Sequence, residues 1–300
     1  VARSSSKANL SACVTKLGLG SILCTKNKLN LNCKFMDPKN MKLVVQEKYG
    51  NIARGSLLNS CCGSGSSCCD SLEYSMIGDE YSGIEGHIND ADMGLGCGIP
   101  TQFAAIKPGD RLLDLGSGAG NDCFVARHLT GDTGHVTGLD FTKEMVEKAR
   151  LNTQKLGFTN VDFVLGDIEA MPFEDLQFDV VLSNCVLNLV PDKAKAFSEI
   201  WRTLKPGGHF CISDVVISGH LPDELLKDAM LYVGCVTGAL ELEHYLQLIE
   251  DTGFTSLILH KKKAIDLPAS IVQKYNLNSN TTNDFGVYSI TISAYKSRYE

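Results

Sequence analysis

The sequence predicts an α/β fold in which an open, mostly parallel sheet carries helices on its faces. From Asp110 onward, short apolar runs alternate with amphipathic stretches of about ten to fifteen residues, which is the pattern of consecutive βαβ units. A glycine-rich turn lies directly after the first apolar run, where such folds bind ligands. A C-terminal segment of alternating apolar and polar residues adds an antiparallel edge strand.

Each element follows from its local pattern. Apolar residues at helical spacing predict a short amphipathic helix from Pro38 to Ile52. Strands are predicted at 111–115, 134–140, 161–165, 178–183 and 209–213, with helices at 121–129, 142–156 and 193–204 between them. The last of these helices stops at Lys205-Pro-Gly-Gly208, a strong termination signal. Helices at 223–232 and 241–252 and strands at 256–259 and 287–294 complete the chain.

The domain organisation follows from shifts in composition. Residues 1–36 form a basic tail of low order, with six Lys or Arg and no acidic residue before Asp37. This composition resembles an organellar transit segment, and a disordered tail is the alternative. Residues 37–108 carry the first helix and a Cys-rich loop, 109–216 the ligand-binding α/β domain, and 217–300 a substrate-binding and C-terminal region.

Charge and hydropathy exclude two classes of protein. A net charge of −7 disfavours a nucleic-acid binder, which needs a basic face. No apolar run reaches the roughly 18 residues of a membrane span. The mean hydropathy of −0.01 is that of an ordinary globular protein, which we expect to be monomeric and cytoplasmic, or organellar if residues 1–36 are a transit segment.

The twelve cysteines are the unusual part of the composition. A disulfide framework suits short secreted chains, so we expect reduced thiols here. A zinc site is the alternative, but the sequence holds no C-x₂-C pair, and the pairs Cys61-Cys62 and Cys68-Cys69 have the wrong spacing.

The glycine turn and three acids predict a nucleoside pocket. Gly116, Gly118 and Gly120 have the spacing G-x-G-x-G rather than G-x-G-x-x-G, so no pyrophosphate need be bound. Asp114 precedes the turn and suits a cationic or amino-bearing ligand. Asp140 ends the second strand and can accept both ribose hydroxyls, and Asp167 follows the third strand, where an adenine amino group could be read.

This arrangement resembles the class I S-adenosylmethionine-dependent methyltransferases over about residues 105–216, as does the turn Leu204–Gly208. The resemblance implies a Rossmann-like sheet and S-adenosylmethionine as cofactor. It places Asp114 near the methionine end, Asp140 at the ribose, and Asp167 with Ile168 around the adenine. The rest of the predicted cofactor-binding set is Ser117, Phe141, Met145 and Asn184.

Cysteines stand where a methyl acceptor should bind. The seven histidines are dispersed, and none is a persuasive general base. Cys185 follows the fourth strand and should face the crevice of the acids, and Cys235 lies in a segment that could fold over it. Glycines flank Cys97 and Cys235 and are expected to give access to the thiols. Converging thiolates suit a soft substrate such as trivalent arsenic, whose lone pair needs no base.

Four separated motifs resemble the arsenite S-adenosylmethionine methyltransferases, between about Asn40 and Thr252. The motifs are Tyr49-Gly with Cys61-Cys-Gly-Ser64, Leu95-Gly-Cys-Gly98, Ser183-Asn-Cys-Val-Leu-Asn-Leu-Val-Pro-Asp-Lys193 and Gly234-Cys-Val-Thr-Gly-Ala-Leu240. The resemblance implies that Cys185 and Cys235 hold arsenic in a helical insert. Cys97 and a loop cysteine would complete a three-thiolate cage, or reduce the product with a glutathione- or thioredoxin-type reductant. Cys62 is favoured over Cys61, but the second pair at 68–69 departs from the family pattern.

Two other functions remain open at this point. One is carbon or oxygen methylation of a small organic molecule, which would need an acidic or basic catalytic residue. The other is thiol-based sequestration of arsenic or a metal without catalysis, against which the intact series Asp114, Asp140 and Asp167 argues.

Overall fold

The computed structural model describes residues 38–55, 81–219, 238–266 and 286–298. The basic tail, the cysteines at 61, 62, 68, 69 and 235, and the predicted helix at 223–232 lie outside these ranges. The described residues belong to one compact unit, residues 37–300. None of the described helices is long and apolar enough to cross a membrane.

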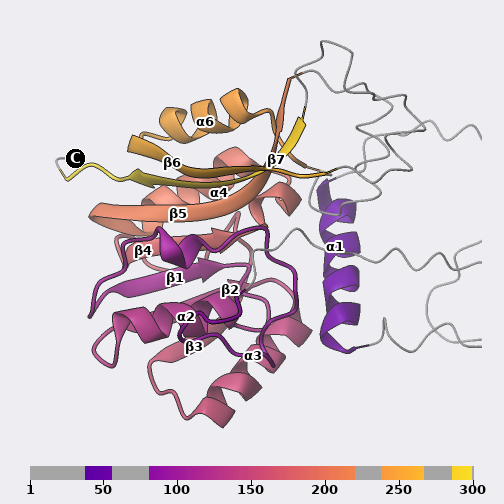
Figure 1. The fold of residues 1–300 in the computed structure, drawn as a ribbon, viewed down its shortest axis with the longest axis vertical. Coiled ribbons are helices and arrows are strands. Elements are labelled where there is room, and N and C mark those ends of the chain that lie inside the picture. The colour runs from indigo at the N-terminus through magenta and orange to yellow at the C-terminus, as the bar shows by residue number, and fades with distance from the viewer. Residues whose placement is uncertain (1–37, 56–80, 220–237, 267–285, 299–300) are drawn as a thin grey trace, which may run out of the picture. The chain divides into compact units, whose positions relative to one another are not determined.

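A seven-stranded sheet forms the centre of this unit, in the order β3-β2-β1-β4-β5-β7-β6 (Figure 1). The strands β1 to β5 pair in parallel, and β7 pairs antiparallel with both β5 and β6. Their bounds are β1 Arg111–Leu115, β2 His135–Asp140, β3 Val161–Leu165, β4 Phe178–Asn184, β5 Leu204–Ser218, β6 Thr255–Ala264 and β7 Gly286–Tyr295. The mostly parallel sheet with an antiparallel strand toward one edge is therefore confirmed.

Helices cover both faces of the sheet. The helices are α1 Pro38–Ala53, α2 Asn121–Thr130, α3 Lys143–Leu156, α4 Lys193–Thr203 and α6 Leu242–Asp251, with short 3₁₀ helices η2 Pro100–Gln102 and η3 Leu187–Leu189. Phe124 of α2 and Val146 of α3 pack with alternate strand residues in one apolar core. Phe197 of α4 and Tyr245 of α6 pack in a second core on the opposite face. Successive side chains of each strand point to opposite faces of the sheet, so each central strand contributes residues to both cores.

The fifth strand differs from its predicted length. β5 runs from Leu204 to Ser218, because β7 pairs with every residue from His209 to Ser218. The prediction ended the strand at Ser213, since Asp214 interrupts the apolar run and a glycine-rich turn precedes His209. A partner strand distant in the sequence, which reaches as far as the pair Ser218 and Gly286, stabilises an extended conformation beyond the predicted end.

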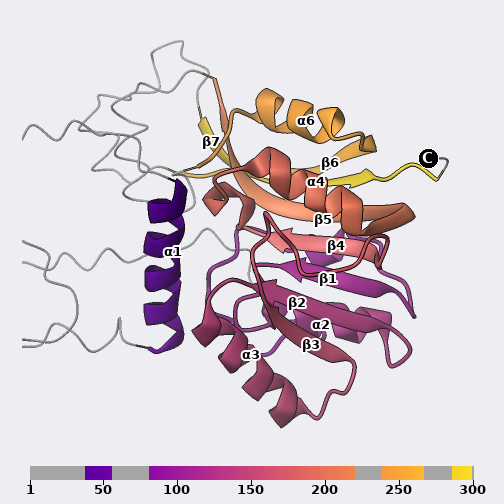
Figure 2. The ribbon, with the colours of Figure 1, turned by 180° about the vertical axis from the view of Figure 1, so that it is seen from behind.

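Helix α1 lies across the carboxyl ends of the central parallel strands, as both ribbon views show (Figures 1 and 2). Polar side chains of the helix and of the residue after it attach this segment to the sheet edge. Lys42 Nζ donates to Asp167 Oδ2 at 2.6 Å, Gln46 Nε2 donates to the carbonyl oxygen of Phe141 at 2.9 Å, and Arg54 pairs with Glu144 of α3. The helix predicted from Pro38 to Ile52 is thereby placed over the edge of the sheet where the acids lie.

Candidate active site

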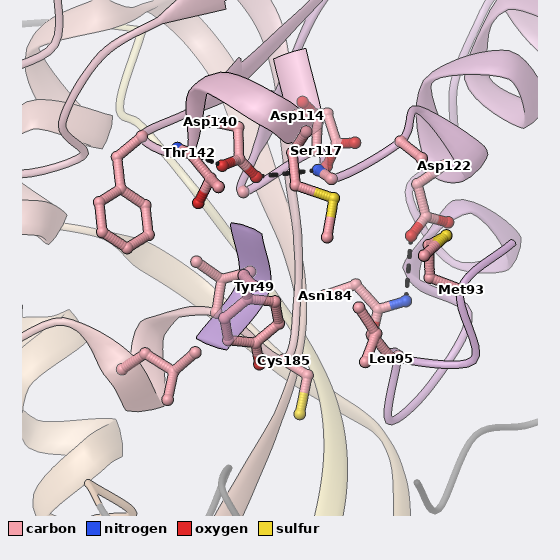
Figure 3. A pocket seen from close by; sticks show the side chains of 18 of the residues that line it. Tyr49, Met93, Leu95, Asp114, Ser117, Asp122, Asp140, Thr142, Asn184 and Cys185 are labelled. Atoms are coloured by element: carbon pink, nitrogen blue, oxygen red, sulfur yellow. Dashed lines mark hydrogen bonds between the residues drawn. The ribbon is translucent and has the colours of Figure 1, made fainter. Parts of the chain in front are cut away.

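A cavity opens at the carboxyl ends of β1, β2 and β4, beneath α1 (Figure 3). Nearly every predicted cofactor-binding residue lines it: Asp114, Gly116, Ser117, Gly118, Asp140, Phe141, Met145, Asp167, Ile168 and Asn184. Gly120 does not. A Cβ at Gly120 would lie 2.8 Å from Phe163 Cζ and 2.9 Å from Phe124 Cε2, so this glycine serves the packing of the turn onto the core.

The glycine turn is fixed by the neighbouring strand. The amides of Gly116 and Ser117 donate to the carbonyl oxygen of Leu139 at 2.7 and 3.0 Å, which ties the end of β1 to β2. Asp140 then accepts from the amides of Gly118 at 3.0 Å and Thr142 at 2.7 Å. Burial raises the pKa of Asp140, and these two backbone hydrogen bonds partly offset the increase. The carboxylate is held in place at the position predicted for the ribose.

Asp122, the second residue of α2, is a member of the site that the sequence analysis missed. Tyr81 Oη donates to one of its oxygens at 2.7 Å, and Asn184 Nδ2 donates to the other at 3.0 Å. It lies close enough to Asp114 to raise the pKa of that carboxyl, after burial, which is the larger cause. Asp114 is 2% exposed and accepts from the thiol of Cys123 at 3.2 Å. Two buried acids therefore share one wall of the cavity.

The cavity suits a cationic ligand. Asp114, Asp122 and Asp140 contribute buried carboxyls to its wall. Among the described residues that line it, Lys42 is the one cation, and it is paired with Asp167 and Glu169. A positively charged group placed between these carboxyls would recover the electrostatic energy that burial removes.

Asn184 connects the acids to the cysteines. Its Nδ2 also donates to the carbonyl oxygen of Gly98 at 2.8 Å, and its Oδ1 accepts from the amide of Cys97 at 3.0 Å. A Cβ at Gly96 would lie 2.7 Å from Asn184 Nδ2, and one at Gly98 would lie 2.6 Å from Ser213 Oγ. The prediction that these glycines give access to Cys97 is therefore wrong. They allow the backbone to approach β4 and β5 closely, and Cys97 is 4% exposed.

Cys97 and Cys185 lie together beside the cavity. Their Sγ atoms and a carboxylate oxygen of Asp214 all lie within 4.8 Å of one another. Cys185 lines the cavity, and its amide donates to the carbonyl oxygen of Ser213 at 2.8 Å. Its φ of +59° is left-handed, a conformation that turns the chain sharply at the end of β4. In Figure 3 Cys185 lies at the end of the cavity opposite Ser117 and Asp140.

Asp214 was not predicted, although a signal for it exists. The sequence analysis selected acids at the carboxyl ends of the first three strands, and Asp214 stands at the same level of β5, opposite the end of β4. It is fully buried, and burial raises its pKa to about 7. Ending the predicted strand one residue earlier, at Ser213, left Asp214 in a presumed loop.

Asp167 occupies its predicted place at the rim but already has a partner. Lys42 bonds to both Asp167 and Glu169, and the amide of Glu169 donates to Asp167 Oδ1 at 3.0 Å. Burial lowers the pKa of Lys42, and the hydrogen bonds to the two acids outweigh it to give a raised pKa. The role of Asp167 in binding adenine stays a prediction.

The wall of the cavity holds polar atoms that lack a partner within the described part of the chain. They are Ser117 Oγ and Asn121 Oδ1, both buried. Buried hydroxyl and amide groups are nearly always hydrogen-bonded, so these atoms indicate that a polar ligand completes them. Together with the three carboxyls they fit a nucleoside that carries a cationic amino-acid tail, as S-adenosylmethionine does.

Comparisons with known proteins identify the family of this chain. A family model described as a methyltransferase domain matches residues 106–253. An arsenite methyltransferase of Halobacterium salinarum is 40% identical over 75% of this chain and 60% of its own length. One from Aquipseudomonas alcaligenes is 34% identical over 84% of this chain and 71% of its own length.

A solved structure gives the same result. The crystal structure of an arsenic (III) S-adenosylmethionine methyltransferase from Chlamydomonas reinhardtii has a TM-score of 0.59 and 30% identity, over 83% of this chain and 75% of that one. The present chain spans about 60% of the length of the Halobacterium protein. By these relationships, the chain belongs to the arsenite methyltransferase family, with the class I methyltransferase fold.

Proposed function

We propose that this protein methylates trivalent arsenic held by Cys97 and Cys185, with S-adenosylmethionine as the methyl donor. The observation that carries the proposal is the convergence of the two thiols beside a cavity walled by acids. When bound, S-adenosylmethionine supplies a methyl group activated by its sulfonium. The relatives named arsenite methyltransferase support the same substrate.

The acids of the cavity bind and orient the cofactor. Asp140, already fixed by two backbone amides, would hold the ribose hydroxyls. Asp114 and Asp122 offer negative charge to the cationic tail, and their low exposure prevents water from screening that attraction. Asn184 bonds to both Asp122 and the backbone of Cys97, and so fixes their positions relative to each other. Donor and acceptor sites are thereby held in one rigid frame.

The cysteines make arsenic nucleophilic without a general base. Arsenic (III) binds thiolates strongly, and it retains a lone pair that can attack a methyl group. Among the described residues that line the cavity there is no histidine, the usual base for oxygen or nitrogen substrates. A substrate with its own lone pair, such as trivalent arsenic, needs no such base.

Further parts of the proposal concern residues outside the described ranges. Cys235 would supply a third sulfur, and Cys62 or Cys61 would reach the site during turnover to form a transient disulfide. A glutathione- or thioredoxin-type reductant would then restore the thiols. A monomeric state and a cytoplasmic location also remain predictions.

The test replaces one sulfur at a time. Cys185→Ser and Cys97→Ser should each reduce the formation of methylated arsenic from arsenite by about 100-fold or more, because the arsenic is no longer held in line with the methyl group. Methylated arsenic is measured by chromatography with mass detection. Binding of S-adenosylhomocysteine, measured by calorimetry, should stay within about twofold.

Cys211→Ser is the matched control, since Cys211 is buried on the other face of β5, in the core shared with α2 and α3. It should retain methylation in proportion to the folded fraction. Full activity of Cys185→Ser would exclude the proposal. Methylation of a small organic acceptor, with arsenite inert, would instead establish carbon or oxygen methylation.

A further inference from the structure

A buried carboxyl lies against the two thiols. Asp214 is fully buried, Cys185 is 3% exposed and Cys97 4%. The distance from a carboxylate oxygen of Asp214 to either sulfur is no more than 4.8 Å. The three side chains come from different parts of the chain, since Cys97 precedes η2, Cys185 follows β4, and Asp214 lies within β5.

The two oxygens of this carboxyl differ in their hydrogen bonding. Tyr245 Oη of α6 donates to Asp214 Oδ2 at 3.2 Å. Oδ1 is buried and has no donor in good hydrogen-bond geometry among the described residues, and the attraction of Lys193 and the backbone amides of Val215 and Asn188 only partly offset the burial that raises the pKa of the carboxyl. Lys193 Nζ itself donates to the carbonyl oxygens of Val190 at 3.0 Å and Asn188 at 3.4 Å. A buried carboxylate oxygen without a donor is costly, which points to a donor that arrives with a ligand.

Arsenous acid brings such a donor. When As(OH)₃ reacts with two thiols, two As–O and two S–H bonds break, and two As–S bonds form. Each thiol proton leaves with a hydroxide as water, and arsenic stays trivalent. The product keeps one hydroxyl on arsenic, and this hydroxyl is a hydrogen-bond donor.

We propose that Asp214 binds this remaining hydroxyl, so that Cys97, Cys185 and Asp214 form a capture site for inorganic arsenite with two sulfurs and one oxygen acceptor. The inference rests on the proposed function and adds a preference among substrates. Arsenicals with one carbon substituent lose both hydroxyls to the two thiols and keep none for Asp214. The carboxyl therefore strengthens binding of inorganic arsenite and not of organic trivalent arsenicals.

The test measures binding to the two thiols alone. The 300-residue chain is prepared with serine at every cysteine except Cys97, Cys123, Cys185 and Cys211. Arsenite and phenylarsine oxide are the two probes, and bound arsenic is measured after desalting and by competitive titration. Phenylarsine oxide forms a dithiolate without a hydroxyl. We expect one phenylarsine oxide to bind per protein, and this binding to be lost in Cys185→Ser. That result would identify Cys97 and Cys185 as the binding pair.

In this background Asp214→Asn and Asp214→Leu should weaken arsenite binding by about 10- to 100-fold, as expected for a lost charge-assisted hydrogen bond, with Leu the more severe. Both variants should bind phenylarsine oxide within about twofold of the parent. Asp179→Asn is the matched control, because Asp179 pairs with Lys205 near the beginning of β4, away from the thiols. It should change neither affinity.

The outcomes separate this inference from the function on which it rests. Failure of the parent to bind phenylarsine oxide at Cys97 and Cys185 would refute the thiol site itself, and with it the proposed function. Normal binding of phenylarsine oxide, with arsenite affinity unchanged in both Asp214 variants, would refute only the role of Asp214. Equal weakening of both probes would also refute it, because that result indicates a structural role.

Discussion

Two glycines of the cofactor turn share a left-handed backbone but face different surroundings. Gly116 has a φ of +65°, and a Cβ there would lie 2.4 Å from Cγ2 of Val186. Gly118 has a φ of +52°, and a Cβ there would meet nothing within 4 Å, because it would enter the cavity. Packing therefore requires the first glycine, and we expect the ligand to require the second.

Alanine at the two positions should separate stability from binding. Gly116→Ala should lower the free energy of unfolding by several kcal/mol, on the order of the sum of left-handed strain and overpacking. Gly118→Ala should cost only about 1–2 kcal/mol but strongly weaken binding of S-adenosylhomocysteine. Urea unfolding and calorimetric titration measure the two effects. Equal loss of stability in both variants would contradict this division.

The residues of the site divide into those with a local signal and those without one. The glycine turn, Asp114, Asp140, Cys97 and Cys185 could be predicted, because each follows a strand end or stands in a marked motif. Tyr81 could not, since its partner Asn184 lies 103 residues further along the chain. The pairing of Asp167 with Lys42 is equally long-range, at 125 residues. Contacts of this kind depend on the assembled fold.

At the scale of elements, α4 is attached to the segment before β4 by one arginine. Arg202 donates to both carboxylate oxygens of Glu199, at 2.7 and 2.9 Å, and to Asp175 at 2.7 Å. The amide of Met171 also donates to Glu199, at 2.7 Å. The hydrogen bond from Arg202 is the largest cause of the lowered pKa of Glu199.

These contacts of Arg202 with Glu199 and Asp175, here called the Arg202 clamp, should make a contribution to stability that depends on pH. Because the pKa of Glu199 is lower in the folded state, its contribution is complete well above its usual value of 4.5 and is lost as the pH falls through the folded-state value. Glu199→Gln should therefore cost about 1–2 kcal/mol near neutral pH, and the difference from the parent should vanish in acid. Urea unfolding at several pH values measures it.

Glu147→Gln provides the comparison, because Glu147 pairs with Lys143 across one exposed helical turn at 3.6 Å. Its cost should be below about 0.5 kcal/mol at any pH. If Glu199→Gln showed the same small cost at every pH, the Arg202 clamp would not hold α4 in place.

Helices and strands whose apolar residues recur at a regular spacing could be predicted, but the residues at which they begin and end were harder to predict. The strands β1 and β3 and the helices α2 and α3 match the predicted ranges to within a residue or so, because an apolar face of one period defines each. The strands β5 and β6 are longer than predicted. Both pair with β7, and pairing partners distant in sequence set where a strand ends.

At the scale of the whole compact unit, α1 completes the wall of the cofactor cavity. Val45 and Tyr49 of α1 line the cavity opposite the glycine turn, and Lys42 links the helix to the loop after β3. A ligand in the cavity would thus contact both α1 and the parallel sheet. Binding should stabilise the attachment of the helix as well as the site itself.

S-adenosylhomocysteine at about 100 times its dissociation constant should raise the free energy of unfolding by about 2.7 kcal/mol. Amide hydrogen exchange, followed by mass spectrometry, should slow in α1 and at the start of α2. Exchange in α6 should change little, because none of its residues lines the cavity. Protection at α2 without protection of α1 would show that α1 does not enclose the cofactor.

At Cys185 the left-handed backbone favours glycine for stability, whereas the proposed chemistry needs a thiol. Elsewhere glycine is less stable than alanine by roughly 0.5–1 kcal/mol, but at a φ of +59° alanine keeps the strain that glycine relieves. We expect Cys185→Gly to be at least as stable as Cys185→Ala in urea unfolding, a reversal of the usual order. Laboratory evolution for heat resistance alone would then tend to discard this thiol, whereas selection on arsenic would restore it.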